Sequence, residues 1–73
     1  MINAVTTFKV NGRDVSVCFD VNASRAERRI TVSVRTYGLG EDNVDLVFPP
    51  DQYGEAMDRY YEICDALEKQ RDQ

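Results

Sequence analysis

The feature that most constrains this chain is a change in the spacing of its apolar residues close to residue 49. Over residues 1–48 apolar side chains recur at every second position, which is the period of a strand with one buried face. Over residues 51–72 they recur with the period of an α-helix, about 3.6 residues. Pro49 and Pro50 separate the two patterns, and proline cannot donate to a strand ladder but fits the first turn of a helix. The chain is therefore predicted to place its strands first and a single helix last.

The ends of these elements are indicated by turn-forming residues between the apolar runs. Asn11-Gly12 is a strong signal for a tight hairpin, and Gly38 and Gly40 suit a turn before the last strand. We expect an α+β fold of the order ββββα, in which a four-stranded antiparallel meander carries one C-terminal helix across one face. At 73 residues the chain has room for a single domain. The strands are expected over residues 2–10, 14–21, 30–37 and 43–48, and the helix over residues 51–71.

The Asn11-Gly12 turn also predicts the register of the first two strands. With a two-residue loop, Val10 lies opposite Arg13 and Phe8 lies opposite Val15, so the apolar side chains of both strands share one face. The same register pairs Thr6 with Val17 and Ala4 with Phe19, and it places Ile2 on this face as well. In the third and fourth strands, alternation assigns Ile30, Val32, Val34, Val44, Leu46 and Phe48 to the buried face, and Thr31, Ser33, Arg35 and Tyr37 to the outer, wetter face.

The predicted helix has an apolar side and an acidic side. A step of about 100° per residue gathers the apolar side chains into one stripe that can cover the sheet. The stripe consists of Tyr53, Ala56, Met57, Tyr60, Ile63, Cys64 and Leu67. The opposite side is expected to carry Asp51, Glu55, Asp58, Glu62, Asp65 and Asp72, with Lys69 as the only base among them. Like charges at this spacing repel one another by a few tenths of a kcal/mol per pair, which favours a use for the acidic side beyond structure.

Charge is distributed unevenly along the chain. Residues 1–37 carry six basic and three acidic residues, which gives +3, and residues 38–73 carry three basic and ten acidic residues, which gives −7; together they make the net charge of −4. The basic residues of the first part concentrate in the segment between the second and third strands. Arg25, Arg28 and Arg29 there could bind an anion through their guanidinium groups. The negative total charge opposes binding to nucleic acid.

The residue types present disfavour catalysis. The chain has no histidine, which excludes Ser-His, Cys-His and the common zinc sites, and no segment matches a cofactor or metal motif. We therefore predict a protein that is not an enzyme, with no catalytic residue, no cofactor and no metal. Two cysteines, Cys18 and Cys64, are too few for a disulfide framework, and no signal sequence or apolar membrane span is present. These features favour a cytoplasmic protein without a membrane anchor.

The function that fits these observations best is binding to another protein. The acidic helix side is expected to dock on a basic surface of a larger protein or protein–nucleic acid complex, although a charged side that only keeps a protein soluble is the commoner case. In size, acidity and lack of catalytic groups the chain resembles the small phage-type inhibitors of host nucleic-acid machinery, anti-CRISPR proteins included. One alternative is a nucleic-acid-binding protein that uses the Arg25, Arg28 and Arg29 segment. Another is a homo-oligomeric structural component joined through a sheet face or edge; the expected state is a monomer or a weak homodimer.

Overall fold

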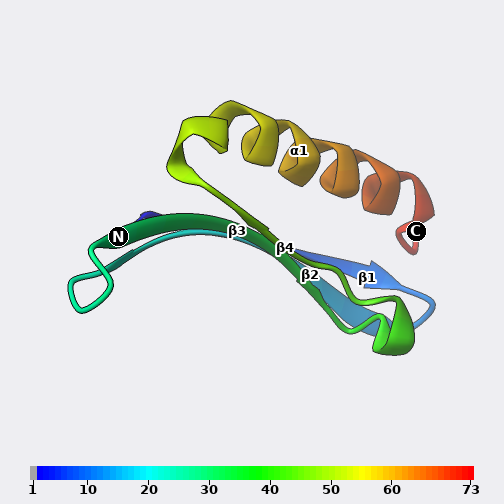
Figure 1. Cartoon of the computed structure of the whole chain (residues 1–73). Helices are drawn as coiled ribbons and strands as arrows, with labels where there is room; N and C mark the ends of the chain where they lie inside the picture. Colours follow the sequence, from blue (N-terminus) through cyan, green and yellow to red (C-terminus); the bar gives the residue numbers. More distant parts are fainter. Residues whose placement is uncertain (1) are drawn as a thin grey trace.

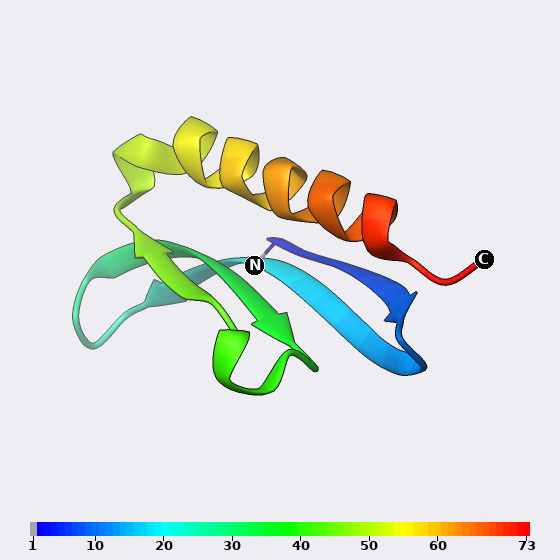
Figure 2. The same cartoon turned by 90° about the vertical axis from the view of Figure 1, so that its right-hand side faces the viewer.

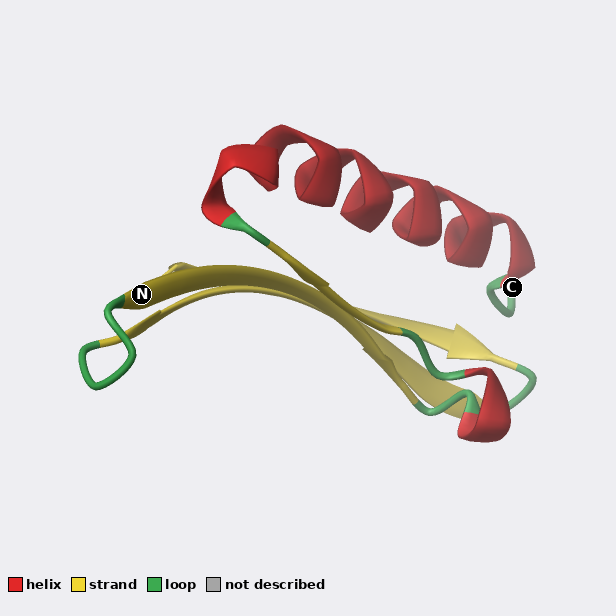
Figure 3. Cartoon of the chain, viewed as in Figure 1, coloured by secondary structure: helices red, strands yellow, loops and turns green. Residues whose placement is uncertain are grey.

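The structure, a computed structural model, describes residues 2–73 and has the predicted ββββα order. One antiparallel sheet contains four strands in sequence order, and the helix α1 lies across one face of it (Figure 1; Figure 2). Two short 3-10 helices, η1 and η2, flank the last strand (Figure 3). The elements are β1 (Ile2–Val10), β2 (Arg13–Ser24), β3 (Arg29–Tyr37), η1 (Gly40–Asp42), β4 (Asp45–Phe48), η2 (Pro50–Gln52) and α1 (Tyr53–Gln70).

The first hairpin has the predicted turn and register. Asn11 and Gly12 have φ angles of 51° and 77°, and such positive values at both central positions are those that a two-residue hairpin turn requires. Val10 pairs with Arg13, and the ladder continues with Phe8 opposite Val15 and Ala4 opposite Phe19. The side chain of Ile2 lies outside the described part of the chain. The hairpin was predictable because its geometry depends only on neighbouring residues.

The core lies between the helix and strands β1, β2 and β3. Phe19 is its largest fully buried side chain, and its ring makes edge contacts with Tyr53 and Tyr60 of the helix at centroid distances of 5.5 and 5.8 Å. Such edge-to-face contacts add to the stabilisation that burial alone provides. The helix is therefore amphipathic in the predicted sense. The buried apolar residues are Phe8, Val10, Val15, Val17, Phe19, Val32, Val34, Ala56, Tyr60 and Leu67.

The hairpin of β2 and β3 is longer than predicted. The residues near its turn are also more exposed than predicted. Pairing between β2 and β3 continues to Ser24 opposite Arg29, so the ladder takes in residues that were expected to form a loop. This hairpin projects past the start of the helix (Figure 1). Ile30 was predicted to be buried but is 49% exposed, because the helix does not reach this end of the sheet. Ala4 of β1 was predicted to share the buried face and is exposed at the edge of the sheet.

The last strand is shorter than predicted because a side chain interrupts its ladder. The backbone N–H of Thr36 donates to the carbonyl of Val44 at 2.9 Å, as in a regular strand pair. The N–H of Val44 instead donates to the hydroxyl Oγ1 of Thr36 at 2.6 Å. Regular pairing then begins only at Asp45. The strand expected over residues 43–48 is thereby reduced to four residues.

Ser33 departs from the predicted pattern of the outer face. Its side chain points to the opposite face from Val32 and Val34, as predicted. It was expected to be exposed to solvent, but it is only 3% exposed. Its neighbours across the ladder are Asp20 on β2 and Val47 on β4, so it lies in the middle of the sheet with strands on both sides. Its hydroxyl oxygen has no hydrogen-bond partner among residues 2–73. A buried hydroxyl in this state costs free energy, because it loses its bonds to water.

Candidate functional site

Five of the six acidic residues predicted for the acidic side lie in η2 and α1 and are exposed. Asp51 lies in η2, and Glu55, Asp58, Glu62 and Asp65 lie on α1; all five are exposed. Their carboxylates are therefore available to a partner.

Asp72 was predicted to belong to this acidic side, and the structure corrects that assignment. The helix ends at Gln70, so Asp72 lies beyond it. Its carboxylate accepts hydrogen bonds from the backbone N–H groups of Asn11 and Gly12, at 2.8 and 2.9 Å. The backbone N–H of Asp72 also donates to the carbonyl of Lys9 at 2.7 Å. Asp72 thus fastens the C-terminal tail to the β1–β2 turn, and its carboxylate serves the fold.

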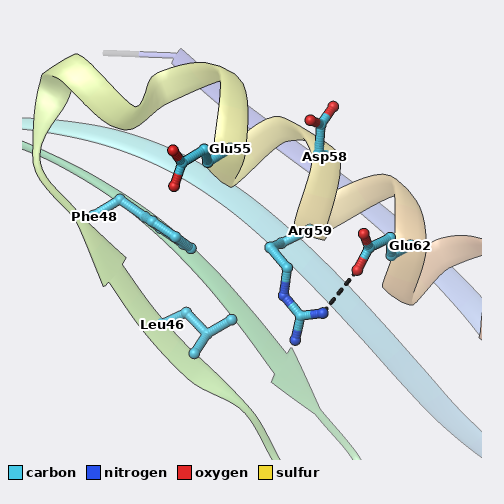
Figure 4. Close-up of a pocket in the computed structure, with 6 residues that line it drawn as sticks. All are labelled: Leu46, Phe48, Glu55, Asp58, Arg59 and Glu62. Atoms are coloured by element: carbon cyan, nitrogen blue, oxygen red, sulfur yellow. Dashed lines mark hydrogen bonds and ion pairs between the residues drawn. The ribbon is translucent and has the colours of Figure 1, made fainter.

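A groove of about 450 Å³ runs between the helix and the last strand. Its floor on the sheet side consists of Leu46 and Phe48, which alternate along β4 and both face the helix (Figure 4). Both side chains are only partly buried, because β4 is the last strand of the sheet and no other strand formed by residues 2–73 lies along its free side. The groove therefore offers exposed apolar surface.

The helix side of the groove is charged. Glu55, Asp58, Arg59 and Glu62 line it from one flank of α1. Arg59 reaches down towards β4 and its Nη1 lies 2.7 Å from Oε2 of Glu62, whereas Asp58 points away from the strand (Figure 4). Glu55 and Asp58 have no ion-pair partner in the part of the chain that the structure describes. The groove therefore carries two carboxylates free to attract a cation beside an apolar floor.

Three residues of this groove were not identified as site residues from the sequence. Leu46 and Phe48 were assigned to the core, and Lys69 was described as the only base on the acidic side, whereas Arg59 lies there too. The spacing of Arg59 and Glu62, three residues apart on a helix, is a signal that predicts their contact. For Leu46 and Phe48 the signal is weaker, because alternation predicts the face of a side chain and not how much of it a helix covers.

The basic segment does not line this groove. Arg25 and Arg28 occupy the turn of the β2–β3 hairpin, and Arg29 begins β3. Arg28 has a positive φ of 51°, a value that the tight turn imposes. All three side chains are exposed, and none of them forms an ion pair within residues 2–73. The structure therefore does not combine the acidic and basic candidates into one site.

Neither cysteine has the character of an activated nucleophile. Burial, and then the negative charge of Asp20, raise the pKa of Cys18, and the opposing effect of Arg35 across the ladder is smaller. Burial also raises the pKa of Cys64. A nucleophilic cysteine depends on its thiolate form, which a raised pKa makes scarcer. Both cysteines are free thiols.

Three further findings bear on metal binding, membrane insertion and relationship to known proteins. Within the described residues, no group of three or more cysteine, aspartate or glutamate side chains is arranged to hold a metal ion. No helix formed by residues 2–73 combines the length and the apolar character needed to cross a membrane. No protein-family model, curated protein or solved structure matches this chain.

Proposed function

We propose that this protein is a non-catalytic binding module that docks the exposed acidic side of α1 and the adjoining groove on a basic surface of a larger partner. The observation that carries the proposal is the combination found in the groove. Glu55 and Asp58 lack cationic partners within the described chain, and Leu46 and Phe48 next to them are incompletely covered.

The chemistry of the groove suits a lysine or arginine of the partner. The aliphatic stem of such a side chain can lie on Leu46 and Phe48 while its charged head reaches Glu55. Asp58, which points away from the strand, adds to the attraction from outside the groove (Figure 4). An arginine head can also stack on the ring of Phe48. The apolar contact contributes affinity, and the carboxylates contribute selectivity and a faster approach of a positively charged partner.

A stable complex needs more surface than the groove alone. A standard interface buries about 800 Å² on each partner, and the whole surface of this protein is 5337 Å². The exposed carboxylates of Asp51 and Asp65 extend the docking surface along α1. The partner we propose is a protein, or a protein–nucleic acid complex, with a basic surface. The free thiols favour its action in a reducing cytosol.

The partner class to test first is a nucleic-acid-binding protein. A basic groove that holds phosphates is also complementary to a row of carboxylates. The general resemblance to small phage-type inhibitors, anti-CRISPR proteins among them, supports the same choice. In this proposal the module inhibits its partner by occupying the nucleic-acid site.

The test compares two variants with equal changes in charge. One carries Glu55→Lys, Asp58→Lys and Asp65→Lys, and the control carries Glu27→Lys, Glu41→Lys and Asp42→Lys, which are exposed acidic residues outside the docking surface. Each variant is checked for folding by circular dichroism and used to capture partners at about 0.15 M salt. We expect the wild type and the control to retain a basic protein that DNA displaces, and the docking-surface variant to lose it. Equal retention by both variants contradicts the proposal.

A second measurement separates the alternative function. In a salt titration against DNA and RNA, tight binding with a steep salt dependence, abolished by changing Arg25, Arg28 and Arg29 to alanine, identifies a nucleic-acid-binding protein instead. Our proposal expects no such binding.

A further inference from the structure

Strand β1 forms a free edge of the sheet. The backbone N–H and C=O groups that point outward from this edge can be identified. Among the strands that the structure describes, only β2 pairs with β1. The carbonyl of Lys9 accepts the N–H of Asp72, so it points away from β2. In an antiparallel strand, residues two apart direct their backbone groups to the same side. Asn3, Val5 and Thr7 therefore present their N–H and C=O groups at the free edge, and no hydrogen bond within the described chain occupies those groups.

The two edges of the sheet are protected to different degrees. The edge at β4 is four residues long, begins with the charged Asp45 and is followed by Pro49, and such features block the addition of another strand. The edge at β1 is nine residues long and contains no proline. Its only charged residue is Lys9, at the end where the C-terminal tail already lies. An unprotected edge of this length is typical of a pairing site.

The flank of the helix above β1 is also suited to burial. The bond between the hydroxyls of Thr6 and Tyr60 places β1 next to this side of α1. Met57, Tyr61 and Cys64 share the flank, because they are spaced four and three residues apart. Met57 and Cys64 are partly buried, and Tyr61 is 57% exposed. The other flank, towards β4, carries Glu55, Arg59 and Glu62. Met57, Tyr61 and Cys64 thus lie on the side where the sheet edge is open, together with Glu68, which follows Cys64 by four residues and forms an ion pair with Arg71 at 2.8 Å. Glu55, which is unpaired within the described chain, lies on the side where the edge is blocked.

We propose that two copies of this chain pair through their β1 edges, antiparallel and centred on Val5, to form one continuous eight-stranded sheet. In this register the two Val5 residues exchange backbone hydrogen bonds, and Asn3 of each copy pairs with Thr7 of the other. The arrangement has two-fold symmetry. It places the polar side chains of Asn3 and Thr7 opposite each other, and the side chain of Val5 opposite its counterpart in the other copy.

Charge and geometry favour a second copy as the occupant of this edge. The two helix flanks that meet above the joint carry Met57, Tyr61 and Cys64, and the Glu68 beside them is paired with Arg71 of its own chain. The groove lined by Glu55 and Glu62 remains on the far side of each copy. Pairing centred on Val5 also leaves Lys9 and the C-terminal tail in place, because it uses only the open part of the edge. The dimer therefore presents two acidic docking surfaces, and its formation does not depend on the proposed function.

The experiment compares two valines in matched positions. Val5 and Val47 are both 58% exposed, and both lie on edge strands. In each strand the neighbouring residues bond to the rest of the sheet, so the N–H of each valine points outward. Proline is tolerated at an edge position whose N–H faces outward, but it removes that donor and blocks pairing. By sedimentation velocity over a range of concentrations, we expect dimers for the wild type and for Val47→Pro. For Val5→Pro we expect monomers, or a dimer at least about tenfold weaker.

Two results contradict the proposal: a wild type that remains monomeric up to millimolar concentration, and equal dimerisation of the two proline variants. If Val5→Pro fails to fold, amide hydrogen exchange of the wild type decides. The proposal expects the amides of Asn3, Val5 and Thr7 to become protected as concentration rises, while that of Val47 stays unprotected. Amides at β1 that exchange equally fast at all concentrations exclude the pairing.

Discussion

The hydroxyl of Tyr60 lies 2.7 Å from the hydroxyl of Thr6, which bonds the helix to strand β1 as well as packing it on the sheet. Both residues are distant in the sequence, so this bond fixes the helix against an edge strand of the sheet. Tyr60 is buried and its ring also contacts Phe19. This pair therefore contributes to both the position and the stability of the helix.

Removing this hydrogen bond is expected to lower the free energy of unfolding by about 1 kcal/mol. Tyr60→Phe keeps the ring and loses only the hydroxyl, and Thr6→Val removes the other partner at similar volume. In a double-mutant cycle measured by urea unfolding, the two changes should be coupled by at least about 0.5 kcal/mol. Tyr61→Phe is the control: Tyr61 is 57% exposed and its hydroxyl has no side-chain partner within residues 2–73, so the free energy of unfolding should change little. Strict additivity of the two changes would show that the bond contributes nothing.

Stability is expected to fall in alkaline solution. Burial raises the pKa of Tyr60 above its ordinary value of 10.0, and burial raises the pKa values of Cys64 and Cys18 above their ordinary value of 9.0. The unfolded chain loses these protons at lower pH than the folded protein, so the folded protein binds more protons in that range. Their contribution is complete below about pH 9 and is lost as pH rises through the folded pKa values.

Urea unfolding at about pH 7 and about pH 10 measures this dependence. A variant with Cys18→Ser, Cys64→Ala and Tyr60→Phe should lose less stability between the two values than the wild type does. An equal loss in both proteins would mean that other groups cause the alkaline effect.

The tail residue Asp72 is expected to stabilise the fold through the β1–β2 turn. Asp72→Ala leaves the N–H groups of Asn11 and Gly12 without their acceptor. Because these groups are exposed and water can replace the carboxylate, the expected loss is about 1 kcal/mol. Thermal unfolding measures it, with Asp65→Ala as a control at an exposed helix position. If the two variants unfold alike, the tail contact does not contribute to stability.

Two glycines should respond to alanine in opposite directions. At Gly38 the φ angle is +96°, and an added Cβ would overlap the backbone carbonyl of Asp14, so Gly38→Ala should cost about 3 kcal/mol. Gly54 lies in the first turn of α1 with open space around it, and Gly54→Ala should stabilise the protein by about 0.5 kcal/mol. Urea unfolding of the two variants provides the comparison. A destabilised Gly54→Ala would indicate a role for this glycine that its surroundings do not show.

Replacing Ser33 is expected to stabilise the sheet. Its buried hydroxyl has no partner within the described chain, so Ser33→Ala removes a polar group that has lost its bonds to water. The expected gain is about 1 kcal/mol in thermal or urea unfolding. Ser16→Ala is the control, because the Ser16 hydroxyl lies 3.0 Å from that of Thr7 at the exposed surface. Destabilisation by Ser33→Ala would show that the hydroxyl makes a bond that these contacts do not reveal.

Local features of this protein were predictable from its residues. The β1–β2 register follows from the length of the Asn11-Gly12 turn and from alternation, and both are short-range properties. The apolar stripe of the helix follows from its period in the same way. Element ends were less predictable, because they depend on single contacts such as that of the Thr36 hydroxyl with the N–H of Val44.

The candidate site was predictable only in part. The sequence indicated Glu55, Asp58 and Glu62 as exposed carboxylates, and each is exposed. It did not indicate the apolar floor beside them, nor that the carboxylate of Asp72 would bind the chain's own backbone. Both features depend on contacts between residues that are distant in the sequence. The local spacing of apolar residues does not predict such contacts.

The sequence by itself determined which side of each element is apolar, the order ββββα and the tight first turn, because all three depend on neighbours along the chain. Only the tertiary structure decided how far the helix covers the sheet. That one placement leaves Ile30 exposed at one end, opens the groove at Leu46 and Phe48, and brings Tyr60 against Thr6 of the edge strand β1. The physical reason is that burial depends on which surfaces meet in space. A pattern of residues shows only which surfaces are apolar enough to be buried.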